Sequence, residues 1–147
     1  MVAVQTSITV DDRIVQAALA RLGSHLDDMT EPMDEIGVML VSSVTHRFET
    51  GVGPDGRPWI PSARALSEGG QTLVMRGHLR DSQTHVAGPR SVEVGTNLVY
   101  GAVHQFGGRA GRGLSVTLPA RPYLGLDGDD EAEILDIIND WIGGGLP

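Results

Sequence analysis

Residues 30–51 read TEPMDEIGVMLVSSVTHRFETG and predict a helix with one apolar face. Thr30 can cap its first turn, Pro32 lies where a missing N–H is tolerated, and acidic residues stand near the positive end. Gly51 can end the helix in the left-handed conformation. At spacings of three and four, the apolar positions are Met33, Ile36, Leu40, Val44 and Phe48. So narrow a stripe predicts that the helix packs on a core along one side.

A second helix is expected upstream, which makes residues 1–50 a helical segment. Asp11 or Asp12 can serve as its N-cap. The apolar residues that follow at helical spacing are Ile14, Val15, Ala18, Leu19, Leu22 and Leu26.

Turn-forming residues follow the first stretch, with GVGPDGRPW at residues 51–59. We therefore expect a loop over 51–64. Beyond it, short elements alternate with breaks at Gly and Pro. The expected elements are a helical piece over 73–79, strands over 82–86 and 91–95, a short helix from Asn97, a flexible loop over 107–113, a strand over 114–118, an extended piece over 123–126 and a helix over 127–142.

This order predicts one α+β domain over residues 1–147. Its antiparallel sheet would have about four strands. The two N-terminal helices, the short middle helix and the C-terminal helix would pack mainly on one face of that sheet.

Composition excludes several kinds of chemistry. The chain has 147 residues, a net charge of −8 and no cysteine, which excludes disulfides, thiolate zinc sites and cysteine nucleophiles. All 11 basic residues are Arg, so Schiff-base and P-loop lysines are excluded. No stretch approaches the roughly 20 apolar residues of a membrane span, and the first ten residues show no secretory signal. We expect a soluble, intracellular or virion-type protein with no membrane contact.

Charge is distributed in blocks along the chain. Residues 1–50 carry a net −5, residues 51–126 a net +4 and residues 127–147 a net −7. Such blocks can form faces of opposite sign that favour head-to-tail association of identical subunits. They can also arise because acids gather at helix starts while Arg gathers in strands and loops. The sequence leaves both interpretations open.

No catalytic, metal or cofactor site is predicted, and we expect a protein that is not an enzyme. The glycines of residues 51–56 match a dinucleotide fingerprint in form, but they follow a helix instead of a strand. The five histidines lack the spacing of metal ligands, and there is no Gly-x-Ser-x-Gly elbow. Adjacent carboxylates such as Asp129 and Asp130 stand where helix capping explains them.

Five residues are candidate partner contacts. Trp59 lies in a Pro-rich loop, where it either pins the loop to the core or anchors a partner. Arg109 and Arg112 lie in a Gly-rich segment, which suits an assembly loop or, as the alternative function, a small Arg-mediated nucleic-acid-binding module. Arg57 and Arg121 complete the set. The acidic total argues against nucleic acid as a partner, except for DNA that passes through an assembly.

Four segments, taken in order, resemble one family. Residues 47–59 resemble its RF…G…P-G…W signature, and residues 77–82 its G-x-L-x-x-S element. Residues 95–107, GTNLVYGAVHQFG, resemble its G-T…Y-A-x-x-H-Q-F-G block, with Gly101 where Ala is usual. Residues 119–125, PARPYLG, resemble its P-A-R-P-F-L-G block. The family is phage virion morphogenesis, the tail completion proteins of tailed phages and prophages (the Mu-type G protein group).

This resemblance implies a structural role and no catalytic residues. It implies tail completion or head–tail joining, with a homo-oligomeric ring at the end of the tail tube or on the head–tail connector. The protein would then be found in the virion neck or tail end, and in the host cytoplasm during assembly. The motif residues expected to define the fold are Gly51, Gly56, Gly95, Tyr100, His104, Phe106, Gly107, Pro119 and Pro122.

Some of these motif residues receive specific expected roles. Tyr100, His104 and Phe106 would fasten the short middle helix to the sheet, and His104 could bond the loop at 51–59. Pro119 and Pro122 would set a sharp exit from the third strand. Arg121 could bind a carboxylate within the subunit or across an interface.

Overall fold

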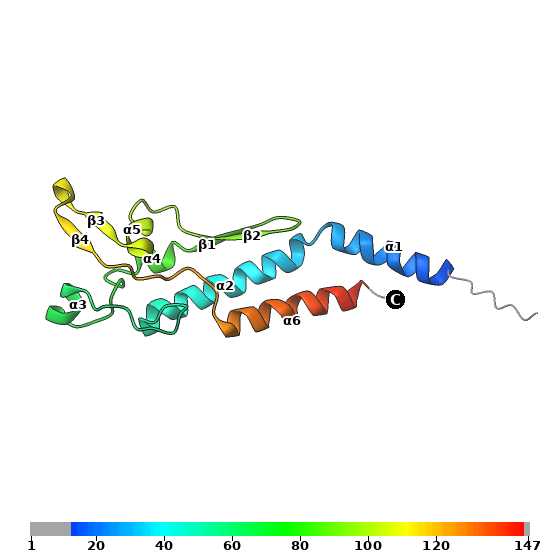
Figure 1. Ribbon diagram of the computed structural model, residues 1–147, viewed down its shortest axis with the longest axis horizontal. Helices are drawn as coiled ribbons and strands as arrows, with labels where there is room; N and C mark the ends of the chain where they lie inside the picture. The colour runs from blue at the N-terminus through cyan, green and yellow to red at the C-terminus, as the bar shows by residue number, and fades with distance from the viewer. Residues whose placement is uncertain (1–12, 146–147) are drawn as a thin grey trace, which may run out of the picture.

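The central element of the computed structural model, which describes residues 13–145, is the helix α2 (Thr30–Thr50) (Figure 1). Its inner face buries Ile36, Val44 and Phe48, as the apolar stripe predicts. Gly51 follows in the left-handed conformation with φ 69°, and its N–H donates to the Arg47 carbonyl, which ends the helix.

Helices and short strands follow one another along the chain, so the α+β class is confirmed. The other helices are α1 (Arg13–Asp27), α3 (Ala63–Glu68), α4 (His78–Asp81), α5 (Gly101–Phe106), the 3-10 turn η1 (Arg112–Leu114) and α6 (Gly128–Gly144). The strands are β1 (Thr84–Ala87), β2 (Val92–Gly95), β3 (Gly108–Ala110) and β4 (Val116–Leu118).

The expected sheet of about four strands is instead two hairpins within the described residues. β1 pairs with β2 antiparallel, and β3 pairs with β4 in the same sense. The first hairpin packs on α2, whereas the second extends beyond α5, so their edges do not meet (Figure 1). Each strand of the second hairpin also has only three paired residues, which is too short an edge to add a further strand stably.

α6 lies beside α2, while α1 stands at one end of the molecule (Figure 1). α6 begins at a capping box, in which Asp127 and Asp130 accept hydrogen bonds from each other's backbone N–H. α1 buries none of its residues. Its C-terminal end is held to α6 by the stacked rings of His25 and Trp141, whose centroids are 4.0 Å apart. The expected N-cap of this first helix, Asp11 or Asp12, lies outside the described residues.

The core is small and lies at the C-terminal half of α2. The Phe48 ring meets the Trp59 ring edge-on at 5.6 Å and the Tyr123 ring at 5.2 Å between centroids. Val44 and Leu79 complete this buried cluster. Residues from distant parts of the sequence therefore share one core, and the segments between them are held at its edge.

Both expected loops contain regular structure. The loop predicted over 51–64 ends in α3, where Ser62 caps the helix by accepting from the N–H of Ala65. The segment expected as a flexible loop over 107–113 contains β3 and the start of η1. The helical piece expected over 73–79 is instead a tight turn region, with α4 starting at its end. β3 forms because it pairs with β4. The hydrogen bonds of that pairing hold residues 108–110 extended, although glycine has a low strand propensity.

Candidate assembly site

Arg47 holds the C-terminal motif segment against α2. Its side chain is buried, with 4% of the residue exposed. One terminal nitrogen donates to the carbonyls of Tyr123 and Gly125 at 2.9 Å, and the other donates to the carboxylate of Asp130 at 2.5 Å. The same nitrogen lies 3.4 Å from Asp127. Arg47 therefore joins α2 to the start of α6 and to the segment before it.

The hydrogen bond from the Asp130 N–H, followed by the Arg47 guanidinium, lowers the pKa of the Asp127 carboxyl. The sequence places Arg47 in a motif without a role and explains Asp130 by helix capping alone, so their pairing was not predicted. One signal could have revealed the pair. Arg47 lies about one turn after Val44 on the apolar face of the helix, and a buried Arg needs an acidic partner from another part of the chain.

Gln105 positions the same segment from the other side. Its carbonyl oxygen accepts from the N–H groups of Tyr123 and Leu124, both at 3.0 Å, and its amide donates to the Leu124 carbonyl. The Tyr123 hydroxyl donates to the Gly101 carbonyl at 2.8 Å. These bonds explain why the two motif blocks of 95–107 and 119–125 occur together, since one satisfies the backbone of the other.

Trp59 pins the first loop to the core. The residue is 6% exposed, and its indole N–H donates to the Pro122 carbonyl at 2.8 Å. Gly51 and Gly56 adopt positive φ in this loop, as its turn chemistry requires. Arg57 lies at the exposed tip, beside Asp55. Of the two interpretations of Trp59, the structure shows the pinned loop.

The roles expected for His104 and Phe106 on α5 are wrong. Phe106 is 78% exposed, so it does not fasten the helix. His104 makes no bond to the 51–59 loop, and its buried Nδ1 has no partner among the described residues. α5 is instead fastened by the Gln105 side chain and by its Gly101 carbonyl, which accepts from the Tyr123 hydroxyl. Burial, followed by the nearby Arg121 charge, lowers the pKa of His104, which favours the neutral ring.

The remaining motif residues serve backbone geometry. Gly107 has φ 74°, and a Cβ there would lie 2.8 Å from the Ala120 nitrogen. Gly95 is the exception: it pairs with Thr84 at the end of β2, and a Cβ there would meet no heavy atom of the described residues within 4 Å. Pro119 follows β4 directly, and Pro122 precedes the buried Tyr123, so the prolines flank the turn away from the hairpin.

Arg121 is buried without a carboxylate partner in the described part of the chain. The residue is 5% exposed, and its Nε donates to the Ile60 carbonyl at 2.6 Å. Burial lowers the pKa of the guanidinium. The expected carboxylate within the subunit is therefore not found, and the terminal nitrogens face a pocket instead.

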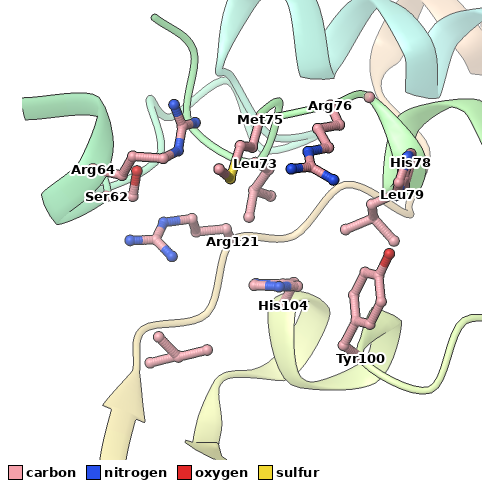
Figure 2. Close-up of a pocket in the computed structure, with 12 residues that line it drawn as sticks. Ser62, Arg64, Leu73, Met75, Arg76, His78, Leu79, Tyr100, His104 and Arg121 are labelled. Atoms are coloured by element: carbon pink, nitrogen blue, oxygen red, sulfur yellow. The ribbon is translucent and has the colours of Figure 1, made fainter. Parts of the chain in front are cut away.

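This pocket has a volume of about 330 Å³ and lies between α3, the 73–79 segment, α5 and the exit from β4. Figure 2 shows the guanidinium groups of Arg64, Arg76 and Arg121 around its apolar side chains. Those apolar side chains are Leu73, Met75, Leu79 and Leu118. His78, His104 and Tyr100 also line it, and no carboxylate does. We call this hollow the arginine pocket.

A second hollow of about 660 Å³ lies between α2 and α6 and has the opposite character. Its carboxylates are Glu35, Glu49, Asp127, Asp129, Asp130 and Glu133. Opposite charges therefore gather at different places on the surface. Arg109 and Arg112 belong to neither hollow, because they stand exposed on the β3–β4 hairpin.

Among residues 13–145, no three side chains of His, Asp or Glu converge as a metal site would require. Within that same range, no helix combines the length and apolar character needed to cross a bilayer.

Comparisons with known proteins agree with the motif geometry. The model of the phage virion morphogenesis family matches residues 10–143. The Mu-like prophage FluMu G protein 2 of Haemophilus influenzae is 39% identical over 127 residues, which cover 86% of this chain and 88% of that protein. The putative capsid assembly protein G of Escherichia phage Mu is 34% identical over 152 aligned positions, covering 95% and 96%. No solved structure matches. A match over nearly the whole chain, together with motif segments that meet in one core, shows that the chain belongs to the phage virion morphogenesis family.

Proposed function

We propose that this chain is a structural protein of tail completion or head–tail joining, which assembles as a ring of identical subunits at the end of the tail tube or on the connector. It acts by occupying a place in the particle and not by catalysis. Family membership supports a role in phage assembly. The name of the Mu relative, a putative capsid assembly protein, also fits a position near the head.

The observation that supports a ring is the exposed apolar surface at both ends of the elongated molecule. On α1, Ile14 is 81% and Leu19 57% exposed. At the opposite end, Phe106 is 78% and Leu114 58% exposed (Figure 1). Apolar patches of this kind mark association surfaces. Two different patches at opposite ends suit a head-to-tail contact, which generates a ring when its rotation closes.

Electron microscopy of particles that carry a labelled copy tests the location. The label is expected at the neck or tail end of complete particles. A label that is absent from complete particles would overturn the proposal.

A paired variant tests the surface without disturbing the fold. Phe106→Ser with Leu114→Ser should leave the melting temperature close to that of the unchanged protein, because both side chains are exposed. Incorporation into particles should fall. Val86→Ser, at a position 67% exposed on β1, is the matched control and should be incorporated normally. Equal incorporation of both variants would contradict the end-to-end contact.

A further inference from the structure

We propose that the arginine pocket receives the outer face of α6 from a second copy of this chain. Leu135 of that copy would enter the apolar part of the pocket, and Glu131 would face its arginines. The inference rests on the proposed function, since it adds the arginine pocket and the outer face of α6 to the head-to-tail contact between neighbouring subunits of the ring.

The pocket side gathers three guanidinium groups, and no carboxylate of residues 13–145 lines it. Arg121 is nine-tenths buried, yet its terminal nitrogens bind no group within the described residues. Arg64 and Arg76 add two more guanidinium groups, and Arg64 is held in place by donating to the Gln71 carbonyl at 2.8 Å. A carboxylate that enters the pocket would pair with these guanidinium groups, whose N–H donors match carboxylate oxygens in geometry.

The α6 side presents the matching chemistry. Leu135 is 60% exposed in the middle of a well-capped helix, which leaves a large apolar side chain without cover. Glu131 lies four residues earlier, on the same face, and is exposed. Asp136 and Asp140 follow on the adjoining flank, and residues 127–147 contain no basic residue. The face therefore combines one apolar knob with carboxylates.

The small volume and apolar lining of the pocket favour a protein segment over a nucleic acid as its occupant. A volume of about 330 Å³ is at the small end for ligand pockets and suits one or two side chains. A phosphate would bury no apolar surface against side chains such as Leu73 and Met75. Leu135 would, and the removal of its side chain from water would favour binding. The pocket and the outer face of α6 belong to different elements, so their contact is heterologous, as a ring requires.

Cysteine cross-linking tests the contact directly, because the chain has no cysteine of its own. One copy carries Met75→Cys and a second, differently tagged copy carries Leu135→Cys. Both side chains are exposed, at 68% and 60%, so the substitutions should not disturb the fold. The two copies are expressed together in cells that assemble the particle, and the lysate is treated with a short bismaleimide. We expect a product that contains both tags.

Val86→Cys, at a position 67% exposed on β1, replaces Met75→Cys in the matched control. It should give little product with Leu135→Cys. Equal yields from the two pairs, or no product from Met75→Cys, would overturn the proposed contact.

Charge exchange supplies a second test. Arg76→Glu in the copy with Met75→Cys, or Glu131→Arg in the copy with Leu135→Cys, should lower the yield about tenfold through like-charge repulsion. The two changes together should restore the yield. Arg90→Glu, at an exposed position outside the pocket, should leave the yield unchanged. A combined variant as weak as the single ones would overturn the assignment.

The failure of this contact can be told apart from the failure of the proposed function. If labelled protein is found at the particle neck but Met75→Cys and Leu135→Cys never join, the proposed location stands and this docking is wrong. If the protein is absent from particles, the proposed function itself falls. If a DNA duplex protects Met75→Cys from alkylation, the pocket is a nucleic-acid site and the docking is overturned.

Discussion

At the scale of single residues, one guanidinium group does much to hold this fold together. Arg47 binds Asp130 and two backbone carbonyls from the interior, where both partners are shielded from water. An isolated pair on the surface contributes far less, because solvent screens it. The cost of breaking the buried pair arises from the charge that is left behind.

Arg47→Ala is therefore expected to lower the free energy of unfolding by about 3–5 kcal/mol, since Asp130 would remain buried without its partner. Urea denaturation measures this change. Arg57→Ala is the matched control, because Arg57 has an 87% exposed side chain 3.9 Å from Asp55. It should change stability by less than about 1 kcal/mol. Similar losses in the two variants would contradict the assigned role of Arg47.

His104 predicts a dependence of stability on pH. Burial lowers the pKa of its ring in the folded state below the ordinary value of 6.5. As the pH falls through that value, the unfolded chain takes up a proton that the folded chain does not, so the folded state loses stability down to the folded pKa. His104→Gln should show a smaller loss of stability between about pH 7 and 5, in denaturation curves recorded at each pH.

Tyr100→Phe is the control for that experiment. It keeps the His104 ring and its edge-on aromatic neighbour, 6.1 Å away between centroids. It should therefore keep the steeper fall of the unchanged protein. If His104→Gln and Tyr100→Phe lose stability equally on acidification, the buried ring is not the source.

A side chain at position 101 would clash with its neighbours. A Cβ at this position would lie 2.6 Å from Thr96 Cγ2 and 3.0 Å from the Tyr123 hydroxyl. Thr96 cannot easily move, because its hydroxyl lies 2.6 Å from that of Ser82 and accepts from the Leu98 N–H. Gly101→Ala should destabilise the fold by about 1–3 kcal/mol in thermal or urea unfolding. Gly95→Ala, where no heavy atom lies within 4 Å, should change it by under about 0.5 kcal/mol.

At the scale of elements, the helices differ in how firmly they are held. α2 contacts β1, β2, α4 and α6, whereas α1 buries no residue and meets the body through its C-terminal end. An element with few buried contacts unfolds locally at a small cost in free energy, so α1 should open more readily than α2.

Hydrogen exchange should therefore be faster in α1 than in α2. His25→Ala removes the ring stack on Trp141 and should speed exchange in α1 further, while α2 keeps its protection. Ser24→Ala, at the preceding exposed position, is the control and should leave the pattern unchanged. Equal protection of α1 and α2 would show that α1 is held by more than this stack.

At the scale of the whole molecule, the chain is elongated and its core lies toward one side (Figure 1). The buried cluster gathers at the C-terminal half of α2, and the ends of the molecule carry exposed apolar side chains. A subunit of this shape leaves surface to be covered by its neighbours.

Small-angle scattering of the isolated subunit measures this shape. A compact domain of this length would have a radius of gyration of about 15 Å. We expect a clearly larger value, because α1 stands away from the core. A value near that of a compact domain would mean that α1 folds back onto the body in solution.

The sequence by itself determined the long helices, the α+β class and the motif segments. These follow from local rules: the apolar stripe of 30–51 makes a helix, Gly51 ends it, and the acids from Asp127 onward cap another helix. For Trp59 the sequence left two interpretations, and the hydrogen bond from its indole N–H to the Pro122 carbonyl shows that it pins the loop.

Only the tertiary structure decided how these pieces combine. The strands form two hairpins because β1–β2 packs on α2 while β3–β4 extends away, and local pattern carries no information on which edges meet. The bonds of Arg47 to Asp130, and of Gln105 to the segment at 123–124, join residues far apart in sequence. Likewise, Arg64, Arg76 and Arg121 form one pocket only because α3, the 73–79 segment and the exit from β4 converge in space. Burial and charge pairing depend on which surfaces come together, and that is a property of the fold and not of any single segment.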